Sequence, residues 1–141
     1  MVGIFPTAGQ ICSATSRLLV HSSIADELTE ALVAAATRVA VGDPLSESTQ
    51  MGALISAAQQ ESVLTAVTTA SADGGQILCG GGALRPEGLE GGYYVLPTVL
   101  GSVPFGSTGW TDEIFGPVIC VRRRGAIPPH RPTAPTPHPS T

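Results

Sequence analysis

The chain has 141 residues, of which 43% are hydrophobic, and a formal net charge of −4. This length and composition suit one modest domain with a core and exclude a fully disordered chain. The seven basic residues are all arginines and form no broad basic region, and no apolar run approaches the roughly eighteen residues of a membrane helix, so neither nucleic-acid nor membrane binding is expected.

The first predicted elements are a strand and a helix. Residues 17–21 form an apolar strand, and Ser23 is the expected N-cap of the helix, with Asp26 as its acidic partner. The run Gly42-Asp43-Pro44 is the expected stop. The apolar face of this helix is predicted at Ile24, Leu28, Leu32, Ala35 and Val39.

A second helix is predicted to begin after Ser56, with Gln59 completing a capping box, and to end at Gly74-Gly75. Its buried face is predicted at Ala57, Val63, Leu64, Val67 and Ala70.

Short apolar strands follow. They are predicted at residues 76–79, 94–96, 98–100 and 117–121, the middle two meeting around Pro97 and the last being fully buried. Arg122, Arg123 and Arg124 are interpreted as a solvated strand end. Helices that alternate with short strands predict an α/β layered fold, in the form of an incomplete sheet with flanking helices.

The composition changes near Gly125. Residues 125–141 hold six prolines and almost nothing apolar, which is typical of a disordered tail. We therefore expect residues 1–124 to form the domain and residues 125–141 to stay disordered.

The cysteines Cys12, Cys79 and Cys120 are odd in number and widely spaced, which favours neither a disulfide framework nor a zinc site. No metal is expected, and Cys79 and Cys120 are predicted to be buried strand residues. The segment 1–5 lacks the pattern of a signal peptide. We expect a soluble intracellular protein in a reducing compartment, with the cytoplasm favoured.

Two segments carry candidate chemistry. Cys12 follows the small residues Ala8 and Gly9, which leave room for a substrate beside a thiol, although a lone cysteine is more commonly a small buried hydrophobe. Asp112 and Glu113 precede the last strand as an acidic pair, suited to acid–base work or to a solvated helix end. The glycines at 80–82 lack the lysine of a phosphate loop and are interpreted as a turn.

Both segments resemble the aldehyde dehydrogenase superfamily. Phe5, Gly9-Gln10-Ile11-Cys12, Ala14 and Arg17 match its active-site signature, and Glu113-Ile114-Phe115-Gly116-Pro117 matches a second hallmark. The stretch 9–20 is most similar to plant betaine aldehyde and aminoaldehyde dehydrogenases. The resemblance implies a partial catalytic domain of that family.

The resemblance also implies residue roles. Cys12 becomes the nucleophile that attacks an aldehyde to give a thiohemiacetal and then a thioester, with its backbone N–H as an oxyanion donor. Glu113 is expected to bind the nicotinamide-ribose hydroxyls of NAD or NADP, and Phe115 to pack near the nicotinamide. Asp112 is interpreted as a surface charge.

Two positions depart from the plant branch. Ala8 stands where that branch usually has asparagine, and Pro6 stands where it usually has a tryptophan that boxes a quaternary ammonium group. Loss of that tryptophan weakens the expectation of betaine aldehyde as the substrate.

The parts that the family needs for turnover are not among these residues: the dinucleotide-binding half, the oxyanion asparagine and the glutamate base. We therefore expect an inactive fragment, from a truncated gene or splice product or a frame shift near Arg122. An alternative is a non-catalytic product that associates with full-length subunits. A thiol hydrolase pairing Cys12 with a histidine is a weaker alternative, since His21 is interpreted as a surface residue and His130 and His138 fall in the tail.

Overall fold

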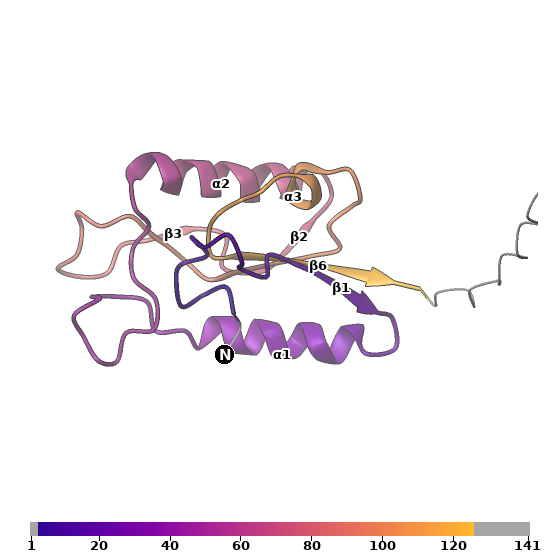
Figure 1. Cartoon of the computed structure of the whole chain (residues 1–141), viewed down its shortest axis with the longest axis horizontal. Coiled ribbons are helices and arrows are strands. Elements are labelled where there is room, and N and C mark those ends of the chain that lie inside the picture. Colours follow the sequence, from indigo (N-terminus) through magenta and orange to yellow (C-terminus); the bar gives the residue numbers. More distant parts are fainter. Residues whose placement is uncertain (1–2, 126–141) are drawn as a thin grey trace, which may run out of the picture.

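A four-stranded sheet lies between two helical layers in the computed structural model, which describes residues 3–125 (Figure 1). The strands run in the order β1-β6-β5-β2. Their bounds are β1 (Arg17–His21), β6 (Val118–Arg124), β5 (Thr98–Gly101) and β2 (Gln76–Cys79). Helix α1 (Ala25–Thr37) covers one face, whereas α2 (Ala57–Ala72) and the short α3 (Thr108–Thr111) cover the other. The predicted α/β layered class is confirmed.

The sheet is mixed. β6 pairs in parallel with both β1 and β5, with Arg17 opposite Cys120 and Leu100 opposite that same cysteine. β2 is antiparallel to β5, and their register shifts between Ile77 and Cys79. A separate two-stranded sheet joins β3 (Ala83–Leu84) to β4 (Tyr94–Val95). The apolar segment around Pro97 thus divides into β4 and β5, which belong to different sheets.

Central strands supply the core. Residues 118–121 of β6 and 98–101 of β5 are buried throughout, as expected of strands covered by helices on both faces. In β2, at the sheet edge, Ile77 and Leu78 are exposed instead. The best-covered large side chains include Ile4, Phe5, Met51, Val63, Val67 and Leu100.

The start of α1 differs from the prediction. Its N-cap is Ile24, which offers no side-chain hydrogen bond to the helix. The Ser23 hydroxyl instead lies 2.8 Å from Nδ1 of His21, so the turn after β1 uses the side chain that was expected to cap the helix. The helix also ends at Thr37, earlier than the Gly42-Asp43-Pro44 stop.

The predicted apolar face of α1 is confirmed in part, since Leu28 and Val39 are half-buried against the core. Leu32 is buried as expected, together with Ala25 and Ala36. Ile24 is 53% exposed.

Helix α2 begins as predicted. The Ser56 hydroxyl accepts the Gln59 backbone N–H at 3.2 Å. Val63, Val67 and Ala70 are buried and Leu64 is half-buried, whereas Ala57 in the first turn is exposed. Only half of the capping box forms, because the Gln59 side chain turns away from Ser56.

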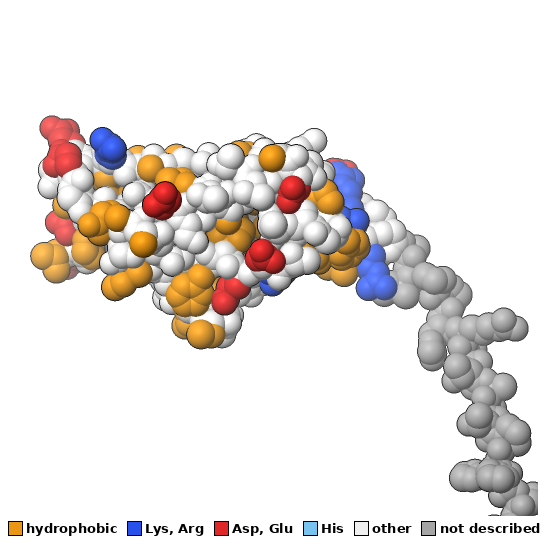
Figure 2. Space-filling view, turned by 90° about the horizontal axis from the view of Figure 1, so that it is seen from above, with side chains coloured by type: hydrophobic (Ala, Val, Ile, Leu, Met, Phe, Trp, Pro, Cys, Tyr) orange, Lys and Arg blue, Asp and Glu red, His pale blue; other side chains and the backbone are white. Residues whose placement is uncertain are grey.

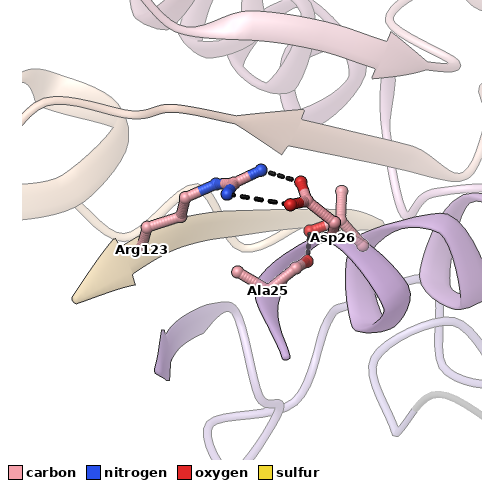
Figure 3. A network of polar contacts seen from close by, with 4 residues as sticks. Ala25, Asp26 and Arg123 are labelled. Atoms are coloured by element: carbon pink, nitrogen blue, oxygen red, sulfur yellow. Dashed lines mark hydrogen bonds and ion pairs between the residues drawn. The ribbon is translucent and has the colours of Figure 1, made fainter. Parts of the chain in front are cut away.

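The arginine triplet forms the end of β6, as predicted, with Arg123 and Arg124 exposed and Arg122 half-buried. Arg122 donates to the Val103 carbonyl at 2.7 Å, and its guanidinium carbon stacks 3.6 Å from the Phe105 ring centre. Arg123 pairs with Asp26 at the start of α1 (Figure 3). Both partners of that pair are largely exposed, so it contributes little to stability.

None of the helices within residues 3–125 has the length and apolar character needed to cross a lipid bilayer. Of the predicted disordered tail, 125–141, all but Gly125 lies outside the described residues.

Candidate functional site

Cys12 sits on a tightly turned loop ahead of β1. The loop is anchored by the buried side chains of Ile4 and Phe5. Their carbonyls accept the N–H groups of Gly9 (2.8 Å) and Ala8 (2.9 Å). The Cys12 side chain is exposed, and no hydrogen bond from its backbone N–H reaches another residue in the described range. The loop therefore presents both a thiol and an available N–H donor.

The loop turns through left-handed backbone at two successive residues, Ala8 (φ 51°) and Gly9 (φ 69°). Glycine adopts this conformation without strain, but alanine pays a steric penalty of about 1–2 kcal/mol. Asparagine tolerates this conformation better than alanine does, so an asparagine at position 8 would relieve part of the strain.

The second motif follows α3. Asp112 and Glu113 are exposed, and the chain then turns at Phe115 with a positive φ of 49° before Gly116 and Pro117 lead into β6. A bulky residue in left-handed backbone is uncommon, and such residues cluster at functional sites.

The two motifs are in direct contact. A Cβ built on Gly9 would lie 1.8 Å from the Gly116 carbonyl oxygen and 2.8 Å from the Pro117 nitrogen. A Cβ on Gly116 would in turn lie 2.5 Å from a Val63 methyl carbon of α2. Glycine at both positions lets the backbones of the Cys12 loop and the Phe115 turn touch, and lets the Val63 side chain of α2 pack directly on that turn.

Side chains reinforce this contact. Oε1 of Gln10 accepts the Ile55 N–H at 3.0 Å, just ahead of α2. Nε2 of Gln59 donates to the Phe115 carbonyl at 3.0 Å. Arg17 of β1 donates to the Asp112 carbonyl. These roles of Gln10, Gln59 and Arg17 were not predicted, because each bond joins segments distant in the chain.

Glu113 lines an open groove of about 520 Å³ between α2 and the α3 segment, on the face seen in Figure 2. Its polar lining residues are Glu61, Ser62, Thr65, Thr69, Thr108, Asp112 and Glu113. Carboxylates and hydroxyls without a basic residue suit the hydroxyls of a ribose but not a pyrophosphate, which needs positive charge or N–H donors. Cys12 does not line this groove, so the groove holds only the Glu113 side of the site.

The other two thiols are less available than Cys12. Cys120 is buried, as predicted; its thiol donates to the Gly109 carbonyl at 3.1 Å, and burial raises its pKa to about 11, against a smaller lowering by Arg17. Cys79 is only half-buried, less than predicted, and burial raises the pKa of its thiol, against a smaller lowering by the Val99 backbone. His21 is exposed, as predicted.

Comparisons with known proteins agree with this geometry. Residues 1–125 match the family described as "Aldehyde dehydrogenase family". The chain is 47% identical over 124 residues to a chloroplastic betaine aldehyde dehydrogenase of Amaranthus hypochondriacus, covering 88% of this chain and 24% of that protein. It is 46% identical over 120 residues to the peroxisomal aminoaldehyde dehydrogenase 1 of Pisum sativum, covering 85% and 24%.

Solved structures give the same picture. A betaine aldehyde dehydrogenase of Staphylococcus aureus, in complex with NAD+ and carrying a BME-modified cysteine, matches with a TM-score of 0.84 and 31% identity over 88% of this chain and 25% of that one. An aldehyde dehydrogenase of Bacillus cereus matches with a TM-score of 0.82 and 36% identity, over 88% and 24%. The chain thus spans about a quarter of the length of the proteins it matches.

Proposed function

The chain belongs to the aldehyde dehydrogenase family, and from that premise we propose that it forms the nucleophile-bearing part of an enzyme that oxidises an aldehyde to a carboxylic acid with NAD or NADP. The contact of Gly9 with the Gly116 carbonyl carries this proposal, because it brings the loop of Cys12 against the turn that follows Glu113. Cys12 is the proposed nucleophile, and Glu113 and Phe115 are the proposed cofactor contacts.

Cys12 has two features that covalent chemistry uses, an exposed thiol and a backbone N–H that bonds to no other described residue. Its thiolate attacks the aldehyde carbon, forming a C–S bond while the carbonyl oxygen becomes an oxyanion. The available Cys12 N–H is the donor that this chain offers to that oxyanion. Loss of hydride from the carbon leaves a thioester on Cys12, and water then releases the acid.

The cofactor supplies the hydride acceptor. The groove beside Glu113 supports a role at the nicotinamide-ribose end, where the exposed carboxylate of Glu113 accepts hydrogen bonds from ribose hydroxyls. Phe115, half-buried at the turn, offers an aromatic side chain next to that carboxylate. The groove lining offers no basic side chain to a pyrophosphate.

The proposed substrate class is an aminoaldehyde or betaine aldehyde, by analogy with the named activities of the plant relatives. Pro6 is exposed and has no aromatic ring to stack on a quaternary ammonium group. We therefore favour a primary aminoaldehyde over betaine aldehyde.

The test is reduction of NAD+ or NADP+ by the purified chain, with a panel of aldehydes that includes betaine aldehyde. We expect no turnover from these 141 residues alone, since they correspond to about a quarter of the relatives. Turnover that disappears in Cys12→Ala would show that the chain is an enzyme in its own right and that the prediction of an inactive fragment is wrong.

A second candidate function is association with full-length subunits. The exposed apolar side chains Leu19 on β1 and Ile77 on β2, both on edge strands, favour it, because unpaired sheet edges recruit other chains. Co-purification of the chain with an intact plant aminoaldehyde dehydrogenase would support it, and a monomeric chain in such a mixture would oppose it.

The proposed compartment is a reducing one, and the sequence favours the cytoplasm. The relatives are named chloroplastic and peroxisomal.

A further inference from the structure

Two side chains from different elements hold the backbone on either side of Glu113. Before it, Arg17 of β1 donates to the Asp112 carbonyl. After it, Nε2 of Gln59 in the first turn of α2 donates to the Phe115 carbonyl at 3.0 Å and lies 3.5 Å from the Ile114 carbonyl. The Glu113 carboxylate itself is exposed and makes no hydrogen bond to another residue in the described range.

The turn after Glu113 needs such support. Phe115 has a φ of 49°, a conformation that disfavours a side chain of its size. Residues stay in sparsely populated backbone regions only where the surrounding structure holds them there. If Phe115 relaxed to negative φ, the direction of the preceding peptide, and with it the carboxylate of Glu113, would change.

Gln59 is well placed to prevent that relaxation. Its backbone N–H is accepted by the Ser56 hydroxyl, which fixes its position at the start of α2. Its side chain is free to bond across the interface instead of back to Ser56, and it does so in a half-buried setting where a lost carbonyl partner is costly.

We propose that Gln59, with Arg17 as a second anchor, is a positioning residue that holds the Asp112–Phe115 segment in the conformation that presents Glu113. This inference rests on the proposed function for the role of Glu113, although the hold on the backbone can be measured without any cofactor. Gln59 touches the backbone carbonyls of Ile114 and Phe115, on the chain segment that carries Glu113.

The neighbouring Gln60 provides a matched control. Its Nε2 donates to the Tyr94 carbonyl at 2.7 Å, so Gln60→Met also removes one carboxamide-to-carbonyl bond from α2. The measurement is backbone ¹⁵N relaxation of the free chain. In Gln59→Met the order parameter of Phe115 is expected to fall from about 0.85 to below about 0.6, and in Gln60→Met it is expected to stay high. Equal order parameters at Phe115 in the two variants would overturn the proposal.

A second variant removes only the donor. Gln59→Glu keeps the length of the side chain, but a carboxylate cannot donate to a carbonyl. It is expected to loosen Phe115 as Gln59→Met does, and a rigid Phe115 in this variant would contradict the proposal even if Gln59→Met fails to fold.

Cofactor binding separates this inference from the proposed function. NADH is titrated into the free chain, with the fluorescence of Trp110, the one tryptophan, as the signal. If the parent binds NADH, its Kd should rise roughly tenfold in Gln59→Met and stay unchanged in Gln60→Met, as expected for a lost hydrogen bond of ordinary strength. If the parent does not bind NADH, the cofactor role of Glu113 fails for this chain, and the relaxation data alone decide on Gln59.

Discussion

Gly9 lies so close to Gly116 that a Cβ on Gly9 would stand 1.8 Å from the Gly116 carbonyl oxygen. No side chain fits between these backbones, and Gly9 also has a positive φ of 69°. The contact joins the loop of Cys12 to the turn after Glu113, so both halves of the candidate site depend on it.

Gly9→Ala should therefore be among the most damaging single-methyl changes in the chain. Overpacking against backbone and left-handed strain together predict a loss of about 3 kcal/mol in the free energy of unfolding. Gly82→Ala is the control, because a Cβ there meets nothing within 4 Å. Urea unfolding of both variants checks the prediction, and similar midpoints for the two would contradict the contact.

Ala8 tests the left-handed turn. Ala8→Gly has two opposing effects: it relieves the backbone strain at φ 51°, and it raises the conformational entropy of the unfolded chain. Because the two effects nearly cancel, the free energy of unfolding should stay within about 0.5 kcal/mol of the parent. Ala70→Gly, at a buried position in α2, should cost about 1.5 kcal/mol through lost helix propensity and a lost methyl contact. A larger loss from Ala8→Gly than from Ala70→Gly would show that Ala8 does not adopt the left-handed conformation.

The three thiols should differ in reactivity. Cys12 is exposed, whereas burial raises the pKa of both Cys79 and Cys120 and so depletes their thiolates. At mildly alkaline pH iodoacetamide should label the folded chain first at Cys12, then at Cys79 and last at Cys120. Peptide mass spectrometry gives the order, with the urea-unfolded chain as the control in which all three react alike.

Cys120 predicts a dependence of stability on pH. Its pKa is about 11 in the fold, against 9.0 for an unperturbed thiol, so between these values the unfolded chain loses the proton while the folded chain keeps it. The protonated thiol contributes its full stabilisation below pH 9 and loses it as the pH rises to 11. The free energy of unfolding should fall by roughly 2–3 kcal/mol over this range. The Cys120→Ala variant should lose less stability over this range than the parent does. Parallel curves for the two proteins would rule out the raised pKa.

The sequence predicted the layered fold well, because it follows from local patterns. β1 has its predicted bounds, Ser56 caps α2, and the last strand is buried as its unbroken apolar run implied. The cap of α1 was missed, because His21 competes for the hydroxyl of Ser23.

The site was only half accessible from the sequence. The resemblance singled out Cys12, Glu113 and Phe115, but spacing gave no sign that Gly9 packs on Gly116 or that Gln59 reaches Phe115. Gln59 already had a local explanation as a capping-box residue, and only the position of α2 against the Phe115 turn reveals its other partner. Contacts between distant segments depend on tertiary packing, which no local pattern encodes.

The covalent role of Cys12 is tested most directly by acyl transfer from p-nitrophenyl acetate. In this reaction the thiolate attacks the acetyl carbon, p-nitrophenolate leaves, and an acetyl thioester remains on Cys12. We expect a burst of a single equivalent from the parent and from Cys79→Ala, and none from Cys12→Ala. The folded chain should react roughly tenfold or more faster than the urea-unfolded chain, because the loop N–H stabilises the oxyanion. A burst that survives in Cys12→Ala, or a folded chain no faster than the unfolded one, would contradict Cys12 as the nucleophile of a built site.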